Sequence, residues 1–193
     1  MASWTIIESD RGVVQIRPAV PADAVRLREL RLAALAGNPT AFSADYTLSS
    51  QEPIQAWVER LERYALGAND TLRVAEAGSA LVGMCGIFRD PRPKTRHIGT
   101  IWGVYVDPAW RGVKIGERLI QACLEWAVSH EVAFVRLAVN NTNVAAIQCY
   151  IRCGFSVYGV EPKSLFYEGR YYDELLMGRE LEGKNENKQN GNP

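Results

Sequence analysis

Three strand-like segments follow one another between residues 71 and 106, and they constrain the fold of this chain more than any other feature. The segments are Thr71–Ala77, Leu81–Phe88 and His97–Val106. A Gly78-Ser79 turn joins the first two, and a proline-rich loop over residues 90–96 joins the last two. The sequence therefore predicts an antiparallel meander within a mixed α/β (α+β) fold.

A helix with one apolar face is predicted before the meander. Pro21 favours its first turn, and Gly37 marks its end. Its apolar residues recur at spacings of three and four, at Leu27, Leu30 and Ala34. We therefore expect Arg26, Arg28 and Arg31 on the solvent-facing side.

A second helix is predicted from Pro53 to the residue before Gly67. Its apolar stripe consists of Ile54, Trp57, Leu61 and either Tyr64 or Ala65. Residues 40–52, which include Phe42 and Tyr46, have too little periodicity for a regular element. They predict an irregular loop of the kind that often carries substrate contacts.

Further strands and helices complete one predicted domain over residues 1–181. They are a hairpin of Trp4–Glu8 with Val13–Arg17, a helix over Ile115–His130, a strand over Phe134–Val139, a short helix over Val144–Arg152, and strands over Phe155–Val160 and Tyr171–Met177. Pro162 and Gly169 are predicted in the connection between the last two strands. Residues 182–193 contain no apolar residue to bury, so they predict a disordered tail.

The charge balance argues against nucleic acid or a membrane as the partner. The chain has 22 Lys plus Arg and 22 Asp plus Glu, so its summed charge gives no long-range attraction to phosphate backbones or anionic lipids. No apolar run approaches the length of a spanning helix, and Met1–Asp10 lacks the features of a secretion signal. We expect a cytoplasmic protein.

The cysteine pattern argues against a structural metal site. The four cysteines form no CxxC pair, and they are Cys85, Cys123, Cys149 and Cys153. Only His97 and His130 could join them as ligands. We therefore expect no metal cofactor, and buried thiols in a reducing compartment.

The segment Trp102–Leu119 (WGVYVDPAWRGVKIGERL) combines a strand, a glycine-containing loop and the start of a helix. Backbone N–H groups over residues 112–116 would point outward at the positive end of the helix dipole, and Arg111 can add a charged contact. The spacing is not that of a P-loop, and no GxGxxG follows a strand, which excludes kinase and dehydrogenase motifs. The segment predicts a pyrophosphate site, although similar glycine loops also serve as plain connections.

A second motif covers Asn143–Phe155 (NVAAIQCYIRCGF). Asn143 begins a short helix, and Tyr150 lies two turns later on the same face. The two side chains could contact one ligand. Alternatively, Asn143 only caps the helix and Tyr150 only packs in the core.

Together the two motifs resemble the GNAT superfamily of acetyl-CoA-dependent N-acetyltransferases. The order of elements is similar from Val13 to Leu181, and the residue-level match covers Trp102–Phe155. The resemblance implies a mostly antiparallel twisted sheet of about seven strands, flanked by about four helices, in which a splayed strand pair binds acetyl-CoA. The implied acetyl-CoA contacts are Val104, Tyr105, Val106, Arg111, Gly112, Val113, Lys114, Ile115, Gly116 and Asn143.

One residue departs from the family pattern. The family loop reads R/Q-x-x-G-x-G/A, and Lys114 replaces its central glycine between Arg111 and Gly116. The later pattern N-x-x-A-I-x-x-Y-x-x-x-G-F matches in full. Because Lys114 keeps its backbone N–H and its ammonium attracts phosphate, we expect altered affinity rather than lost binding.

The resemblance also implies direct transfer, in which an amine attacks the thioester carbonyl, strand N–H groups polarise that carbonyl and the CoA thiolate leaves. Tyr150 takes the role of the acid that protonates the thiolate. The strand His97–Val106 has no Asp or Glu to act as the base. The alternatives are a water chain to solvent and the side chains of Glu52, His97, Asp173 and Glu174.

The acceptor is expected to be a primary amine. Zero net charge favours a small metabolite, drug or amino acid over a protein or peptide amine. In the resembled fold, aromatic residues near the splayed strands could line its pocket, namely Phe42, Tyr46, Trp102 and Tyr172. Alternatives are a protein or peptide N-acetyltransferase, an acyl-CoA-binding module without transfer activity, and an α/β domain that only binds proteins. The resemblance makes a homodimer plausible.

Overall fold

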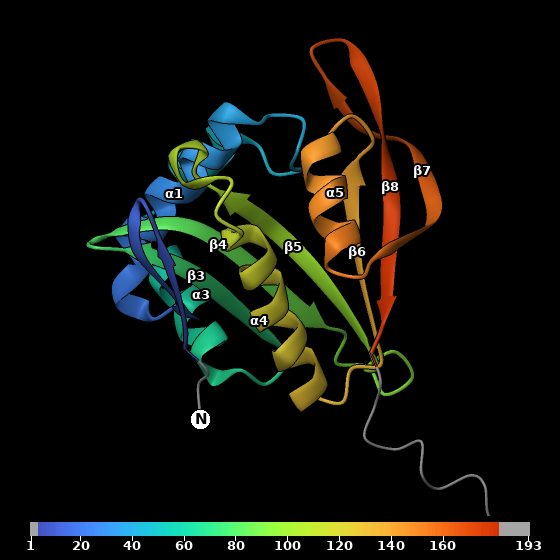
Figure 1. Ribbon diagram of the computed structural model, residues 1–193. Coiled ribbons are helices and arrows are strands. Elements are labelled where there is room, and N and C mark those ends of the chain that lie inside the picture. Colours follow the sequence, from blue (N-terminus) through green and yellow to red (C-terminus); the bar gives the residue numbers. More distant parts are fainter. Residues whose placement is uncertain (1–3, 182–193) are drawn as a thin grey trace, which may run out of the picture.

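The computed structural model describes residues 4–181, and the strands in this range form one sheet of eight strands (Figure 1). The strand order is β1-β2-β3-β4-β5-β6-β8-β7. The strands are β1 (Thr5–Ser9), β2 (Gly12–Pro18), β3 (Asp70–Ala77), β4 (Ala80–Arg89), β5 (Ile98–Val106), β6 (Phe134–Asn140), β7 (Ser156–Tyr167) and β8 (Arg170–Glu180). Neighbours are antiparallel except for the parallel pair β5 and β6. The predicted mostly antiparallel sheet is confirmed, with eight strands instead of about seven.

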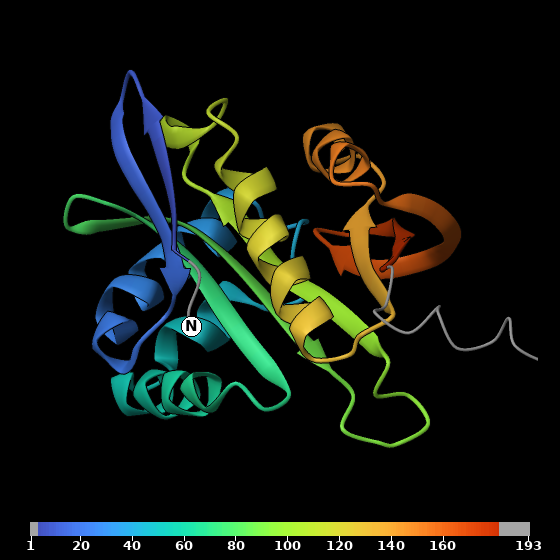
Figure 2. The ribbon, with the colours of Figure 1, turned by 60° about the horizontal axis from the view of Figure 1, so that its bottom comes forward.

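Helices cover both faces of the sheet. Within residues 4–181 there are five α-helices and two 3-10 helices. They are η1 (Pro21–Asp23), α1 (Ala24–Gly37), α2 (Tyr46–Gln51), α3 (Ile54–Leu66), η2 (Pro108–Trp110), α4 (Ile115–Ser129) and α5 (Val144–Arg152). Figure 2 shows α4 on one face, and α1 and α3 on the other. Each face therefore has its own hydrophobic core, one beneath α4 and one beneath α1 and α3.

The apolar periodicity of the sequence predicts most of these elements correctly. The meander is β3, β4 and β5, and the N-terminal hairpin is β1 with β2. The predicted apolar residues Leu27, Leu30 and Ala34 of α1 are buried, as are Trp57 and Leu61 of α3. These faces fold inward because burying apolar surface is the main driving force for packing a helix on a sheet.

The connection before α3 differs from the prediction. The sequence predicts an irregular loop over residues 40–52, but Tyr46–Gln51 form α2. The Asp45 carboxylate caps this helix by accepting a hydrogen bond from the Leu48 N–H at 2.9 Å. Because α2 buries none of its residues, it has no apolar stripe that would reveal it in the sequence.

The last hairpin is longer than predicted. Pro162 lies within β7 and not in the connection. At this point the register between β7 and β8 shifts, between Glu161 and Leu165. Proline lacks the N–H that a regular ladder needs, so an irregular edge strand is where it is tolerated. The predicted disordered tail, residues 182–193, lies outside the described residues.

The strands β5 and β6 part along their length. Their ladder joins only Ile98–Thr100 to Phe134–Arg136, and beyond it β6 is paired with β8 alone. Further along β5, Gly103 and Val104 together face Cys85 of β4, which is a β-bulge. Gly103 has a φ of 64°, a left-handed conformation that glycine adopts without strain. The parting and the bulge lie on the same stretch of β5.

A buried ion network holds β2, β3 and α1 together. The Asp23 carboxylate, which is fully buried, accepts hydrogen bonds from Arg17 at 2.7 and 2.8 Å and from Arg26. Glu76 pairs with the same two arginines at 2.7 and 2.6 Å. Each charge in this network therefore has at least two opposite partners, which offsets its desolvation.

Candidate active site

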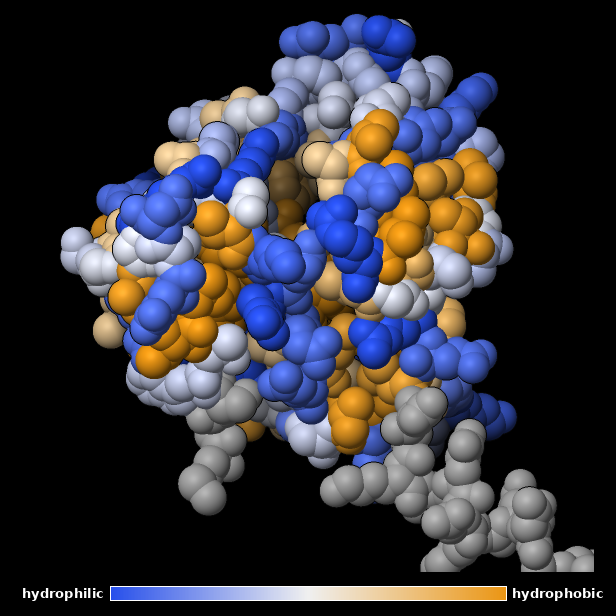
Figure 3. All heavy atoms as spheres, viewed as in Figure 1, coloured by the Kyte–Doolittle hydropathy of each residue, from blue (hydrophilic) through white to orange (hydrophobic). Residues whose placement is uncertain are grey.

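The parting of β5 and β6 opens a cleft of about 490 Å³. Figure 3 shows the hollow between the N-terminal end of α4 and α5. The predicted site residues that line it are Phe42, Val104, Tyr105, Val106, Arg111, Gly112, Lys114, Ile115, Gly116, Asn143 and Tyr150. The two motifs of the sequence therefore meet at one cleft.

Four predicted site residues lie elsewhere. Val113 packs against the core beneath α4, and Trp102 lines a second cavity. Tyr46 lies on α2 with 46% of its surface exposed. Tyr172 lies on β8, beneath the guanidinium of Arg170. Of the four aromatic residues proposed for the acceptor, Phe42 alone lines the cleft itself.

The loop before α4 offers free backbone donors. Within residues 4–181, the N–H groups of Gly112, Val113 and Lys114 donate no backbone hydrogen bond. They lie at the N-terminal end of a 15-residue helix, where the macrodipole is positive. Together these donors and the dipole suit an anion such as a diphosphate.

Two arginines fix the loop. The Arg111 side chain donates from Nε to the Val106 carbonyl at 3.0 Å. Arg11, in the turn between β1 and β2, donates from Nη1 to the carbonyls of Ala109 and Arg111 at 2.6 and 2.7 Å. No sequence motif points to Arg11, because nothing in a distant hairpin indicates that its tip reaches this loop.

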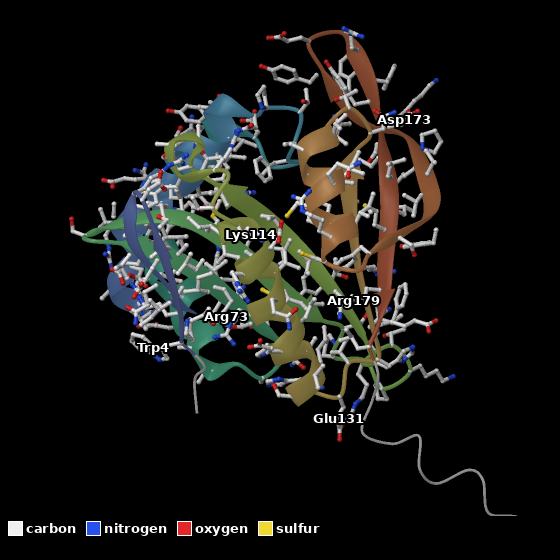
Figure 4. The ribbon with its side chains drawn as sticks, in the orientation of Figure 1. Trp4, Arg73, Lys114, Glu131, Asp173 and Arg179 are labelled. Atoms are coloured by element: carbon white, nitrogen blue, oxygen red, sulfur yellow. The ribbon has the colours of Figure 1, made fainter. Side chains whose placement is uncertain are left out.

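Lys114 has a backbone conformation that glycine adopts without strain. It lies at the N-terminal end of α4 (Figure 4), with φ 62° and ψ 17°. A non-glycine residue in this left-handed region is strained by about 1 kcal/mol. The backbone at this position would accommodate the glycine of the family pattern, and the Lys114 side chain adds a positive charge to the rim of the cleft.

Asn143 both caps α5 and lines the cleft. Its side-chain oxygen accepts a hydrogen bond from the Ala146 N–H at 3.2 Å, so it caps α5. It also lines the cleft. The cap brings the start of α5 to the side of β5, opposite the loop before α4.

Tyr150 is a buried phenol at the wall of the cleft. It is 7% exposed, and its ring meets Phe155 edge-on with centroids 6.2 Å apart. Burial, with a smaller contribution from the nearby thiol of Cys85, raises the pKa of Tyr150 far above its ordinary value. The phenol therefore stays protonated at neutral pH and can donate a hydrogen bond or a proton into the cleft.

The four candidate bases lie outside the cleft. Glu52 forms an ion pair with Arg60 at 3.1 Å. Asp173 and Glu174 accept hydrogen bonds from β7 at 2.8 and 2.6 Å. His97 precedes β5, at the opposite end of the strand from the cleft. A water route for the amine proton stays the simplest prediction.

A second cavity, of about 220 Å³, lies on the face of the sheet that α1 and α3 cover. Its lining consists of Leu27, Arg31, Ala44, Ser49, Glu52, Trp57, Arg60, Tyr64, Leu72, Met84 and Trp102. Arg31 Nη1 and Trp57 Nε1 are buried without a hydrogen-bond partner. The prediction that Arg31 faces solvent is wrong. It follows Leu27 by four residues, which places it on the buried face of α1.

The second cavity adjoins the cleft at two points. The Arg31 guanidinium lies 4.5 Å from the ring centroid of Phe42, which lines the cleft. Arg31 Nη1 also lies 3.7 Å from where a Cβ on Gly103 would be. The bulge in β5 therefore separates the two spaces by little more than one residue.

The comparisons with known proteins agree with this geometry. Residues 38–155 match the model of the acetyltransferase (GNAT) family. The chain belongs to the GNAT family. The match includes both motifs and the whole stretch of β5 that lines the cleft.

Curated relatives of this GNAT chain include enzymes with different acceptors. The L-methionine sulfoximine/L-methionine sulfone acetyltransferase of Pseudomonas aeruginosa is 29% identical over 66% of this chain and 73% of its own length. The N-alpha-acetyltransferase RimI of Mycobacterium tuberculosis is 34% identical over 55% of this chain and 63% of its own length. Two other relatives, from Mycobacterium leprae and Bacillus subtilis, are matched over only 28% and 48% of their lengths.

Solved structures share the fold. A GNAT acetyltransferase from Streptococcus pneumoniae has a TM-score of 0.79 at 24% identity, covering 88% of this chain and 99% of that one. The protein yncA of Salmonella typhimurium, solved with its cofactor acetyl-CoA, has a TM-score of 0.77 at 22% identity, covering 88% and 94%. These likenesses show the GNAT fold.

Within residues 4–181, no group of three or more His, Cys, Asp or Glu side chains could hold a metal ion. No helix in this range is long and apolar enough to cross a membrane.

Proposed function

We propose that this protein transfers the acetyl group of acetyl-CoA to a primary amine of a small molecule in a ternary complex. The observation that carries the proposal is the cleft, in which free N–H groups, a positive rim and a protonated phenol meet between two parting strands. Membership of the GNAT family supports acetyl-CoA as the second substrate. The chain would then be an acyltransferase enzyme.

The residues of the cleft fit acetyl-CoA. The loop over residues 111–116 would hold the diphosphate through its free N–H groups, with Lys114 adding charge. The edge of β5 that has parted from β6 leaves backbone groups of Val104 and the N–H of Val106 to pair with the amide groups of the pantetheine arm, while the Val106 carbonyl already accepts a hydrogen bond from Arg111. Asn143 would contact the arm from the opposite side.

The protein's own groups would then act on the thioester carbonyl and on the departing sulfur. Acetyl-CoA supplies an activated thioester, and a backbone N–H at the β5 bulge would polarise its carbonyl. Tyr150 holds a proton at its phenol oxygen, next to the parted strands, for the departing sulfur. The amine loses its proton to water, because none of the four predicted bases lines the cleft and Glu117, the carboxylate among its lining residues, is paired with Arg152 at 2.7 Å.

A small acceptor is favoured by the size of the second cavity, about 220 Å³, and by relatives named for small acceptors. A protein or peptide N-terminus is the second candidate, which the relative RimI favours. The four cysteines are free thiols, which favours a reducing, cytoplasmic location. A homodimer is a further prediction, for which sedimentation of the purified protein is the test.

Calorimetric titration with acetyl-CoA tests the cleft without knowledge of the acceptor. Dephospho-CoA serves as the comparison, because it keeps the diphosphate and lacks the ribose phosphate. A panel of amines, followed by release of the CoA thiol, then tests transfer. Binding without turnover on any amine, small or peptide, would favour the module without transfer activity, and absence of binding would refute the proposal.

Tyr150→Phe separates chemistry from binding. Loss of the hydroxyl should lower kcat by about 10²- to 10⁴-fold and leave the acetyl-CoA affinity nearly unchanged, because only the acid is removed. The ring and its contact with Phe155 remain. An equal loss of binding would contradict the role of Tyr150 as the acid.

A further inference from the structure

Two unpartnered donors mark the second cavity as a binding site. Arg31 Nη1 and Trp57 Nε1 are both buried and make no hydrogen bond. Both residues line the cavity. A buried donor without a partner loses its hydration and gains nothing in return, so such groups often indicate a ligand.

The charges around the cavity do not cancel. Its ionisable lining is Arg31, Arg60, Glu52 and the neutral phenol of Tyr64. Glu52 pairs with Arg60 at 3.1 Å, whereas no carboxylate pairs with Arg31 within residues 4–181. Burial and the charge of Arg60 lower the pKa of Arg31 from its ordinary value, in the direction expected for a cation that lacks a partner. The cavity therefore has one positive charge in excess.

From these contacts we infer that the acceptor carries a carboxylate, which Arg31 binds in the second cavity, so that the acceptor is an amino acid or a close analogue. This inference rests on the proposed transferase function. A polycationic amine would meet two guanidiniums and a single carboxylate in this cavity, which disfavours it. An amino acid brings the missing negative charge and an amine on one small molecule.

The position of Arg31 suits this role. Its Nη1 lies 3.7 Å from the Cβ position of Gly103, and the next residue, Val104, lines the cleft. A carboxylate held by Arg31 would therefore place an amine a few bonds away beside the bulge. The indole N–H of Trp57 would provide a second donor, and Met84 and Trp102 an apolar wall. A cavity of about 220 Å³ is below the usual range for drug-sized ligands and suits a molecule of amino-acid size.

The test compares matched acceptors that differ only in the carboxylate. L-Amino acids and their carboxamides, such as leucine and leucinamide, are assayed by thiol release with the wild-type protein, Arg31→Gln and the control Arg96→Gln. The Arg96 side chain is 53% exposed, pairs with Glu131 and does not line the cavity, so its substitution removes the same charge from the surface. The wild-type protein and the control should prefer the best acids over their amides by about 10- to 100-fold in kcat/KM. Arg31→Gln should lose this preference by lowering the rate on acids alone.

Direct binding gives a readout that does not need turnover. Thermal shift of the wild-type protein with CoA and each probe should show stabilisation by acids and not by amides, and Arg31→Gln should abolish the difference. Wild-type protein that treats acids and amides alike in both assays would overturn the inference. Failure of the transferase function is distinguishable, because it appears as absence of acetyl-CoA binding or of turnover with any amine, while acid-dependent thermal shifts persist.

Arg31→Met addresses a purely structural role. If Arg31 is a ligand-binding residue, removal of its unpaired buried charge should leave the melting temperature unchanged or raise it. If Arg31 instead stabilises the loop through its contact with Phe42, the melting temperature should fall. A clear fall, together with equal losses on acids and amides, would overturn the inference.

Discussion

Lys114 allows the backbone and the charge of the loop to be tested separately. Its φ of 62° is strained for any residue except glycine, so Lys114→Gly should be more stable than Lys114→Ala by about 1 kcal/mol. For a domain of this size that difference corresponds to roughly 2–4 °C in melting temperature. Scanning calorimetry of the two variants measures it without any ligand.

The same two variants test the ammonium group. A unit charge about 4 Å from a phosphate oxygen is worth about 1 kcal/mol in water, so both variants should bind acetyl-CoA roughly fivefold more weakly at low salt. At high salt the difference from the wild-type protein should shrink, because screening weakens exposed charge pairs. Lys94→Ala, in the exposed loop between β4 and β5, is the control for general loss of a positive charge.

Equal melting temperatures of Lys114→Gly and Lys114→Ala would refute the backbone argument. Unchanged affinity at both salt concentrations would place the ammonium away from the phosphates. A loss of binding in Lys114→Gly far larger than in Lys114→Ala would also contradict the backbone argument, because glycine adopts this φ without strain.

Three further predictions concern the scaffold. Asp23→Ala should destabilise the protein by about 3 kcal/mol in urea unfolding, because it leaves the buried Arg17 with only Glu76 as its partner. Burial raises the pKa of Asp23, but its hydrogen bonds, above all that from Arg17, outweigh burial and lower the pKa below the usual 3.8. The stability that Asp23 contributes is therefore present above pH 3.8 and is lost as the pH falls through the pKa of the folded state. Acid titration followed by circular dichroism should show this loss in the wild-type protein and not in Asp23→Ala. Gly86→Ala should destabilise by about 2 kcal/mol or more in the same assay, since a Cβ there would lie 2.2 Å from the Trp102 ring. Arg11→Ala should weaken acetyl-CoA binding several-fold in calorimetry, with little change in melting temperature, because it releases the loop before α4 from the first hairpin.

The parts of the fold that the sequence predicts are those in which one face is apolar and the other is polar. The meander, α1, α3 and α4 all have such a pattern, and their buried residues follow it. The helix α2 has no buried residue, so its sequence contains no periodic signal. Its cap residue, Asp45, is the only local sign that a helix begins there.

The candidate site divides in the same way. The proposed acetyl-CoA side can be predicted because a glycine loop, Asn143 and Tyr150 belong to contiguous sequence motifs. The proposed acceptor side cannot, since it depends on which helix face meets which strand. Arg31 illustrates this difficulty, because its charge predicts an exposed side chain. Its position nevertheless points inward, since Leu27 and Leu35, four residues before and after it on the same side of α1, are both buried. An arginine four residues from a leucine on either side therefore indicates a partly buried arginine, which a search for apolar residues alone does not detect.

Gly103 connects the two halves of the site. Its left-handed φ of 64° produces the bulge that displaces Val104 from the ladder with β4, and the same turn of the backbone leaves room for the Arg31 guanidinium. A side chain at this position would be strained at its φ and would also extend toward Arg31, whose Nη1 lies 3.7 Å from the Cβ position. Substitution of Gly103 should therefore affect the binding of acetyl-CoA and of the acceptor together, whereas we expect substitution of Lys114 to affect only the first and of Arg31 only the second. This expectation follows from the place of Gly103 in β5, between Trp102, which lines the second cavity, and Val104, which lines the cleft.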